Sequence, residues 1–233
     1  MNLLIKRLID ITASIILIIL LFPAFLVISF LIKIDSKGHV FFKQKRLTKN
    51  GHVFLMLKFR TMVTGAEKIG SGLYNFKNDS RITKVGNFLR KTSLDEIPQI
   101  INVLKGDMSL VGPRPSVINE IGDYNDLNER YKKRFQMKSG ITGLAQVSGR
   151  NDLPWPEKIK YDNLYIDKFK KQGILLDIKI IFLTIISVFK TRSIYETKDS
   201  THVGLTDEQI AIIETEKIIA EATRKDGSIY DKQ

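Results

Sequence analysis

ITASIILIILLFPAFLVISFLI, residues Ile11–Ile32, decides the fold of this chain because the stretch is almost wholly apolar. At a rise of about 1.5 Å per residue, a helix of roughly 20 residues spans the hydrocarbon core of a bilayer. Pro23 lies in the middle of the stretch, where proline removes a backbone donor and kinks or breaks a helix. We therefore expect a membrane-inserted helix that is interrupted at Pro23.

Basic residues flank this apolar stretch on both sides. They are Lys6 and Arg7 before it, and Lys33, Lys37, Lys43, Lys45 and Arg46 after it. Positively charged flanks stay on the cytoplasmic side of a membrane, so a helix–break–helix hairpin that enters and leaves by one face satisfies both. A simple transmembrane anchor is the open alternative. A cleaved signal peptide fits less well, because its apolar core is only about 7–15 residues long and a small-residue cleavage site follows it.

The composition restricts the partners and the metal. The chain has 233 residues and a formal net charge of +12, which favours a polyanion such as nucleic acid, anionic lipid or a phosphorylated substrate, although the charge could serve solubility alone. The apolar segment favours anionic membrane lipids, and no nucleic-acid-binding motif is present, so we expect no nucleic-acid partner. With no cysteine and three histidines, a zinc site is disfavoured, and a metal ion would be Mg²⁺ held by carboxylates and phosphate.

The segments after the apolar stretch predict a mixed fold. Strand-forming residues at 39–44 and 52–59 surround Asn50-Gly51, a strong hairpin signal. Lys58, near the end of the second strand, could protect a sheet edge or contact phosphate. A short basic helix over about 82–91 carries Arg90. The apolar stretch Ile174–Phe189 predicts a second helix, either interfacial or in the core.

Two adjacent acids, Asp95 and Glu96, stand at the predicted start of a helix that runs to about Leu104. Ser93 and Glu96 have the spacing of a capping box, and Asp95 would complement the positive helix end. The same position suits chemistry, because a helix start attracts phosphate and keeps a carboxylate ionised as a nucleophile or Mg²⁺ ligand. The residues alone leave both interpretations open.

Two further segments are candidates for contacts with a phosphorylated ligand. The prolines of Gly112–Pro115 fix the backbone around Arg114, whose guanidinium could bind phosphate bidentately or simply be exposed. The segment Lys138–Arg150 is punctuated by glycines, which allow the backbone to approach a ligand closely.

Taken together, these segments resemble the monotopic bacterial phosphoglycosyl transferases, in the small form that lacks a preceding block of four membrane helices. The matching stretches are Lys6–Asp10, Lys58–Met62, Leu89–Gln99, Asn102–Pro115 and Gly140–Arg150. Two details depart from the family pattern. Phe22 precedes the membrane proline where many members have serine, and Lys138-Ser139 stands where Arg-Pro is usual.

The resemblance implies a reaction between a UDP-sugar and undecaprenyl phosphate, with Mg²⁺ as cofactor. Asp95 would be the nucleophile that forms a covalent phosphosugar-aspartate and releases UMP, and it would also be the metal ligand. Glu96 would position or assist it. The remaining implied residues are Lys58, Arg90 and Arg114 near the phosphates, Gln146 and Arg150 at the nucleotide or sugar, and Pro23 at the break of a re-entrant membrane helix.

We therefore expect an α+β, mostly helical fold. The protein would be monotopic, with an N-terminal re-entrant helix–break–helix, a small β-hairpin and amphipathic interfacial helices, on the cytoplasmic face of the bacterial inner membrane. The expected parts are a membrane hairpin over residues 1–36, a cytoplasmic catalytic domain over 37–199, and a tail over 200–233. A helix in the tail, after a capping box at Thr206, would dock on the body or on a second copy in a homo-oligomer.

Two other functions stay open at this point: a non-catalytic scaffold at the membrane surface, and a soluble nucleotide-binding enzyme with an incidental anchor. The sequence does not distinguish among glucose, galactose, N-acetylated and diamino sugars as the transferred group.

Overall fold

The computed structural model describes residues 2–66, 79–118, 123–149 and 153–189. In this part the chain is mostly helical, with two small two-stranded sheets, so the expected α+β, mostly helical class is confirmed. The predicted tail helix after Thr206 and the candidate residue Arg150 lie outside the described residues.

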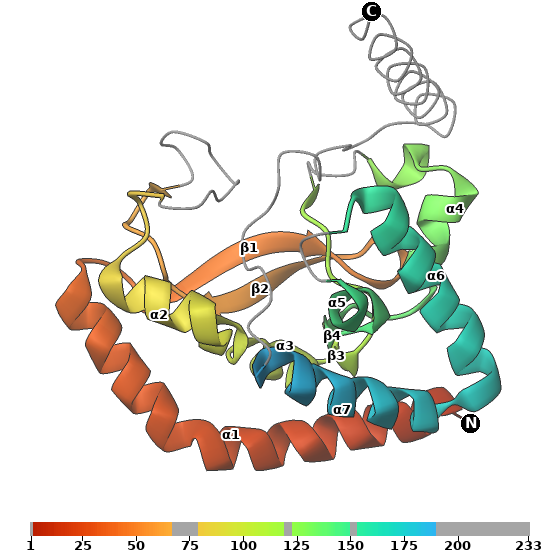
Figure 1. Cartoon of the computed structure of the whole chain (residues 1–233), viewed down its shortest axis with the longest axis horizontal. Coiled ribbons are helices and arrows are strands. Elements are labelled where there is room, and N and C mark those ends of the chain that lie inside the picture. Colours follow the sequence, from red (N-terminus) through yellow and green to blue (C-terminus); the bar gives the residue numbers. More distant parts are fainter. Residues whose placement is uncertain (1, 67–78, 119–122, 150–152, 190–233) are drawn as a thin grey trace, which may run out of the picture.

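The N-terminal apolar stretch forms the long helix α1, Asn2–Asp35, which has 34 residues and contains Pro23. Figure 1 shows that α1 bends part-way along its length and lies along one side of the body. The predicted break is thus a bend within a continuous helix, as expected where proline removes one backbone hydrogen bond and the flanking turns stay helical. Among the described helices, α1 alone is long and apolar enough to cross a membrane.

Both ends of α1 are attached to the folded body. At its C-terminal end, the Asp35 carboxylate accepts a hydrogen bond from Val85 N at 2.9 Å. Arg60 donates to the carbonyl oxygens of Ser36 and Lys37. Ile28 and Ile32 are buried in the same cluster as Phe59 and Leu89. This half of the helix therefore supports the segments that carry Lys58 and Arg90.

The N-terminal end of α1 is held by polar contacts. Lys6 pairs with Asp177, and Arg7 donates to Val103 O at 2.6 Å and to Leu104 O at 2.9 Å. Asp10 accepts a hydrogen bond from Leu110 N at 3.0 Å. Both ends of one long helix therefore contact the same body.

The expected hairpin is present. Strands β1 (Phe41–Leu47) and β2 (Val53–Phe59) pair antiparallel, with Phe42 opposite Lys58. Asn50 and Gly51 take positive φ angles of 57° and 73° in the turn, which explains the Asn-Gly sequence.

A second, parallel pair was not predicted from the sequence. Strands β3 (Ser109–Val111) and β4 (Gly140–Thr142) lie side by side with Ser109 opposite Gly140. The glycines of this region approach backbone rather than a ligand: a Cβ on Gly140 would come within 2.1 Å of Gly112 N, and one on Gly143 within 2.1 Å of Gly112 O. The expectation that these glycines admit a ligand is therefore corrected for Gly140 and Gly143.

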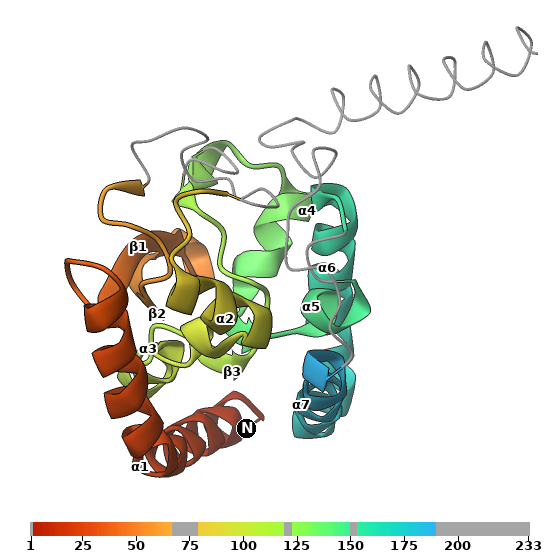
Figure 2. The ribbon, with the colours of Figure 1, turned by 60° about the vertical axis from the view of Figure 1, so that its left-hand side comes forward.

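Short helices connect these strands, and two longer ones cover them. The described helices after α1 are α2 (Lys84–Thr92), α3 (Gln99–Lys105), α4 (Glu129–Lys132), α5 (Leu144–Ser148), α6 (Trp155–Gln172) and α7 (Ile174–Phe189), together with four short 3₁₀ turns. In both views α7 lies near the N-terminal part of α1 (Figures 1 and 2).

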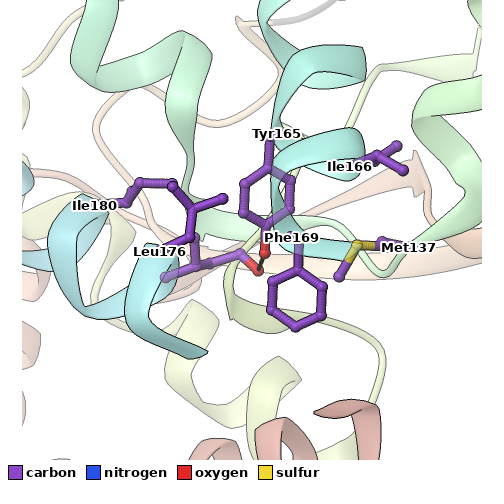
Figure 3. Close-up of a cluster of buried hydrophobic side chains, with 7 residues drawn as sticks. Met137, Tyr165, Ile166, Phe169, Leu176 and Ile180 are labelled. Atoms are coloured by element: carbon purple, nitrogen blue, oxygen red, sulfur yellow. Dashed lines mark hydrogen bonds between the residues drawn. The ribbon is translucent and has the colours of Figure 1, made fainter. Parts of the chain in front are cut away.

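The predicted helix over Ile174–Phe189 is α7, and it has both an interior and an exterior face. Leu176 and Ile180 are buried against Tyr165, Ile166 and Phe169 of α6 and Met137 (Figure 3). In contrast, Leu175 is 75% exposed and Phe182 is 63% exposed. The helix is therefore packed on the core through one face, while its other face presents apolar side chains outward.

Candidate active site

The segment between α2 and α3 carries the two acids. The Thr83 hydroxyl accepts from Gly86 N at the start of α2. After α2, Ser93 takes a positive φ of 59° and Leu94–Glu96 forms a 3₁₀ turn, while α3 begins at Gln99. The predicted helix start at Asp95 is thus wrong by one turn. The capping box is also wrong, because the Ser93 side chain makes no capping bond.

Glu96 binds cations from two other segments. Its Oε1 lies 2.8 Å from Lys58 Nζ of β2 and 3.2 Å from Arg114 Nη2. Burial alone would raise the pKa of the Glu96 carboxyl, but the charges and hydrogen bonds of Lys58 and Arg114 hold this pKa below its usual range. Glu96 is therefore an ionised tether between the two cations rather than a helix cap.

Asp95 lies beside this tether. Its side chain is 12% exposed, and its Oδ2 is 3.8 Å from Lys58 Nζ. Burial raises the pKa of the Asp95 carboxyl, and Glu96 adds to this shift, whereas Lys58, Arg90 and Arg114 oppose it. Asp95 does not lie at the start of α3, which begins four residues later, and the charges that lower its pKa are those of the three cations.

Asn102 bonds α3 to the main chain of β2, a role that the sequence did not predict. The side chain is 1% exposed. Its Oδ1 accepts from Leu57 N at 2.9 Å, and its Nδ2 donates to Leu55 O at 2.8 Å. One amide therefore attaches α3 to the strand that carries Lys58.

The turn that carries Arg114 is fixed at every carbonyl. From Pro113 to Ser116, the carbonyl oxygens accept in turn from Gly140 N (2.9 Å), Arg134 Nη2 (2.6 Å), Arg46 Nη1 (2.9 Å) and Leu47 N (3.0 Å). The Arg114 side chain itself is 41% exposed. The turn is thus held rigidly, while the guanidinium reaches Glu96 and stays accessible to solvent.

Two other predicted residues, Arg90 and Gln146, differ in how the structure relates them to this centre. Arg90 donates from Nε to Thr61 Oγ1 at 2.8 Å, and its charge acts on Asp95. Gln146 lies in α5, and both atoms of its amide are buried without a hydrogen-bond partner in the part of the chain that the structure describes. Buried amides are normally paired, but both amide atoms of Gln146 are shielded from solvent, so its contact with the nucleotide or the sugar stays a prediction. The structure thus brings Lys58, Arg90, Asp95, Glu96 and Arg114 together electrostatically.

The carboxylates at this centre suit a hard cation that is also coordinated by the phosphates of a substrate. Within the described ranges, no group of three or more acidic, histidine or cysteine side chains forms a metal cage. Mg²⁺ typically takes only one or two protein carboxylates and completes its shell with phosphate and water. Since Glu96 is engaged by two cations, Asp95 is the carboxylate that suits this role.

Comparison with known proteins identifies the family. Residues 1–191 match the family described as bacterial sugar transferase. A UDP-glucose:undecaprenyl-phosphate glucose-1-phosphate transferase from Klebsiella pneumoniae is 46% identical over 83% of this chain, and galactosyl transferase CpsE from Streptococcus agalactiae is 44% identical over 79% of it. Exopolysaccharide production protein ExoY from Sinorhizobium fredii is 35% identical over 82%. The chain belongs to the bacterial sugar transferase family, which confirms the resemblance of its motifs to the phosphoglycosyl transferases.

The relatives differ in how much of their length the match covers. The chain spans 42% of the Klebsiella pneumoniae and Streptococcus agalactiae proteins, but 88% of the Sinorhizobium fredii protein. The names of the first two refer to glucose and galactose. Family membership therefore does not determine the sugar.

Proposed function

We propose that this protein transfers a sugar 1-phosphate from a UDP-sugar to undecaprenyl phosphate, or a similar polyprenyl phosphate, and releases UMP. The observation that carries the proposal is the gathering of Lys58, Arg90 and Arg114 around the buried Asp95 and the partly buried Glu96. Phosphoryl transfer depends mainly on positioning and on neutralisation of negative charge, and this centre supplies both. The name of the Klebsiella pneumoniae relative, a UDP-glucose:undecaprenyl-phosphate glucose-1-phosphate transferase, supports the two substrate classes.

The reaction would proceed in two displacements. In the first, a carboxylate oxygen of Asp95 attacks the β-phosphorus of the UDP-sugar; a phosphorus–oxygen bond forms, and the bond to the bridging oxygen breaks with its electrons leaving on UMP. In the second, a phosphate oxygen of the polyprenyl phosphate attacks the same phosphorus. The bond to Asp95 breaks, the carboxylate is regenerated, and a polyprenyl diphosphate sugar leaves.

Each side chain has a distinct role in this scheme. Asp95 is the nucleophile and would be the protein ligand of Mg²⁺, which when bound neutralises phosphate charge. Lys58 and Arg114 contact the diphosphate while remaining tethered by Glu96. Arg90 lowers the pKa of Asp95 by its charge. Gln146, and Arg150 outside the described residues, would contact the nucleotide or the sugar.

The membrane arrangement follows from α1. Both ends of this 34-residue helix contact the same folded body, which a straight helix crossing a bilayer could not achieve with the body on one side. Large apolar side chains on α1 and α7 are exposed, among them Leu4 at 74% and Leu175 at 75%. We infer that α1 enters and leaves the inner membrane by its cytoplasmic face, with anionic lipids beside the basic flanks.

The test is UMP release by the purified full-length protein in detergent, with Mg²⁺, undecaprenyl phosphate and a panel of UDP-sugars. Wild type should release UMP with one sugar, and Asp95→Asn should not. A folded wild type that releases no UMP with any sugar of the panel would favour the scaffold function. UMP release that persists in Asp95→Asn would exclude the aspartyl mechanism.

A further inference from the structure

A buried ion pair contacts the main chain of Arg114. Its two residues are not among those that the proposed reaction uses. Arg134 and Asp162 are 2% and 1% exposed, and their Nη2 and Oδ2 atoms are 2.8 Å apart. The Arg134 guanidinium carbon contacts two aromatic rings, at 5.1 Å from the Trp155 ring centroid and 5.5 Å from that of Phe135. The same Nη2 donates to Arg114 O at 2.6 Å.

Stability alone does not account for such a pair. Removing two charges from water is costly, and well-packed apolar side chains of similar size usually serve a core as well or better. What an apolar pair cannot supply is a hydrogen-bond donor at a fixed place. Arg134 supplies that donor to the carbonyl oxygen of Arg114, and Asp162 together with the two rings fixes the orientation of the guanidinium.

The turn around Arg114 requires donors from outside. Pro113 and Pro115 have no backbone N–H, so the turn cannot be closed by hydrogen bonds from these residues. Its carbonyls instead accept from other segments, and Arg134 is the one that bonds the carbonyl of Arg114 itself. A shift of this turn would move the Arg114 guanidinium away from Glu96, now 3.2 Å away.

We propose that Arg134 and Asp162 are positioning residues, which hold the main chain of Arg114 so that its guanidinium faces Glu96 and the substrate diphosphate. The proposal rests on the proposed function in that it assigns Arg114 to the diphosphate. Neither Arg134 nor Asp162 would touch the substrate, and their effect on catalysis would pass entirely through Arg114.

The test compares four forms of the full-length enzyme: wild type, the double variant Arg134→Met/Asp162→Leu, the single variant Arg114→Ala, and the triple variant that combines all three substitutions. The double variant keeps the core apolar and filled, so its melting temperature should stay near that of wild type. Its kcat/KM should fall by about 10- to 100-fold, the effect of misplacing a binding group by about 1 Å. The triple variant should be no less active than Arg114→Ala, because the pair acts only through that residue.

The matched control is Lys133→Met/Asp167→Leu. This pair joins the same two parts of the chain at 2.8 Å but is more exposed, and it should leave kcat/KM unchanged. The proposal is overturned if the folded Arg134→Met/Asp162→Leu variant is as active as wild type, or if its loss multiplies with that of Arg114→Ala. If the double variant fails to fold, Arg134→Lys replaces it, because lysine keeps the charge beside Asp162. Arg134→Lys must then show the same loss of kcat/KM, and this loss must not add to that of Arg114→Ala.

Amide hydrogen exchange tests the position of the turn around Arg114 without measuring enzyme activity. The backbone amides of Ser116 and Val117 follow the fixed turn, and they should exchange about tenfold faster in Arg134→Met/Asp162→Leu but not in the control variant. Unchanged exchange would overturn the positioning role. If wild type releases no UMP while exchange responds as expected, the proposed function fails and the structural part of the inference stands.

Discussion

The Lys58 ammonium lies 2.8 Å from the nearer oxygen of Glu96, and this contact joins the hairpin to the turn that carries both acids. The same ammonium is 3.8 Å from Asp95. Because Arg114 binds the same Glu96 oxygen, one carboxylate holds two cations beside the proposed nucleophile. A substrate diphosphate would meet these cations already in place, which lowers the cost of organising them.

Replacing Glu96 with Gln should change both activity and its pH dependence. The Glu96 charge raises the pKa of Asp95 and ties up Lys58, so its loss should lower that pKa. Activity needs ionised Asp95, so the acid limb of kcat/KM should move to lower pH in Glu96→Gln. Activity at neutral pH should fall about 100-fold, because Lys58 and Arg114 lose their common tether. A limb that moves to higher pH would contradict this electrostatic account.

Replacing Asn102 with Leu should destabilise the protein by about 2–4 kcal/mol, because Leu57 N and Leu55 O would lose their buried partner. Thermal unfolding measures this as a lower melting temperature. Asn102→Asp, which keeps the acceptor for Leu57 N, tests whether the donor to Leu55 O matters separately. If Asn102→Leu melts like wild type, the amide does not hold α3 to β2.

Replacing Pro23 with Ala should straighten α1, since alanine restores the missing backbone donor. The two ends of α1 could then no longer both reach the body. The chain has no cysteine, so a single cysteine introduced at Asn2 reports the side of the membrane by its reaction with an impermeant thiol reagent. In sealed inside-out vesicles it should react in the wild-type background and should react less with Pro23→Ala. Equal labelling of the two would contradict the role given to the proline.

The buried Asp162 should make stability depend on pH. Burial raises the pKa of the Asp162 carboxyl from its ordinary value of 3.8 to about 6, although the charge of Arg134 opposes this shift. A carboxyl whose pKa is higher in the folded state binds its proton more tightly there, so its contribution to stability is lost as pH rises from about 4 to about 6. Relative to Arg134→Met/Asp162→Leu, wild type should lose about 3 kcal/mol of unfolding free energy across this window. A constant difference between the two proteins would show that Asp162 does not titrate there.

The sequence predicted the features that depend on local patterns. The hairpin follows from Asn50-Gly51 between two strand-forming runs, and the helix Ile174–Phe189 follows from its apolar composition. The bend of α1 agrees with a proline inside an apolar helix. In each case the determining residues are neighbours in the chain.

The features that the sequence did not predict depend on contacts between distant residues. Ser93 and Glu96 have the spacing of a capping box, but Lys58 and Arg114 compete for the Glu96 carboxylate and lie 38 and 18 positions away. Asn102 and Arg134 are polar residues in short segments, and nothing nearby in the sequence indicates that they bond β2 or the Arg114 carbonyl. Packing decides these partners, and a single sequence does not display it.

The most direct test of the account is the mass of the protein after mixing with Mg²⁺ and its UDP-sugar in the absence of polyprenyl phosphate, followed by rapid acid quench. We expect a single burst of UMP, at most one per protein molecule, and a sugar-phosphate adduct on the peptide that contains Asp95. Addition of undecaprenyl phosphate before the quench should remove the adduct. A protein that turns over with both substrates yet carries no adduct, or carries it on another residue, would contradict the covalent role of Asp95.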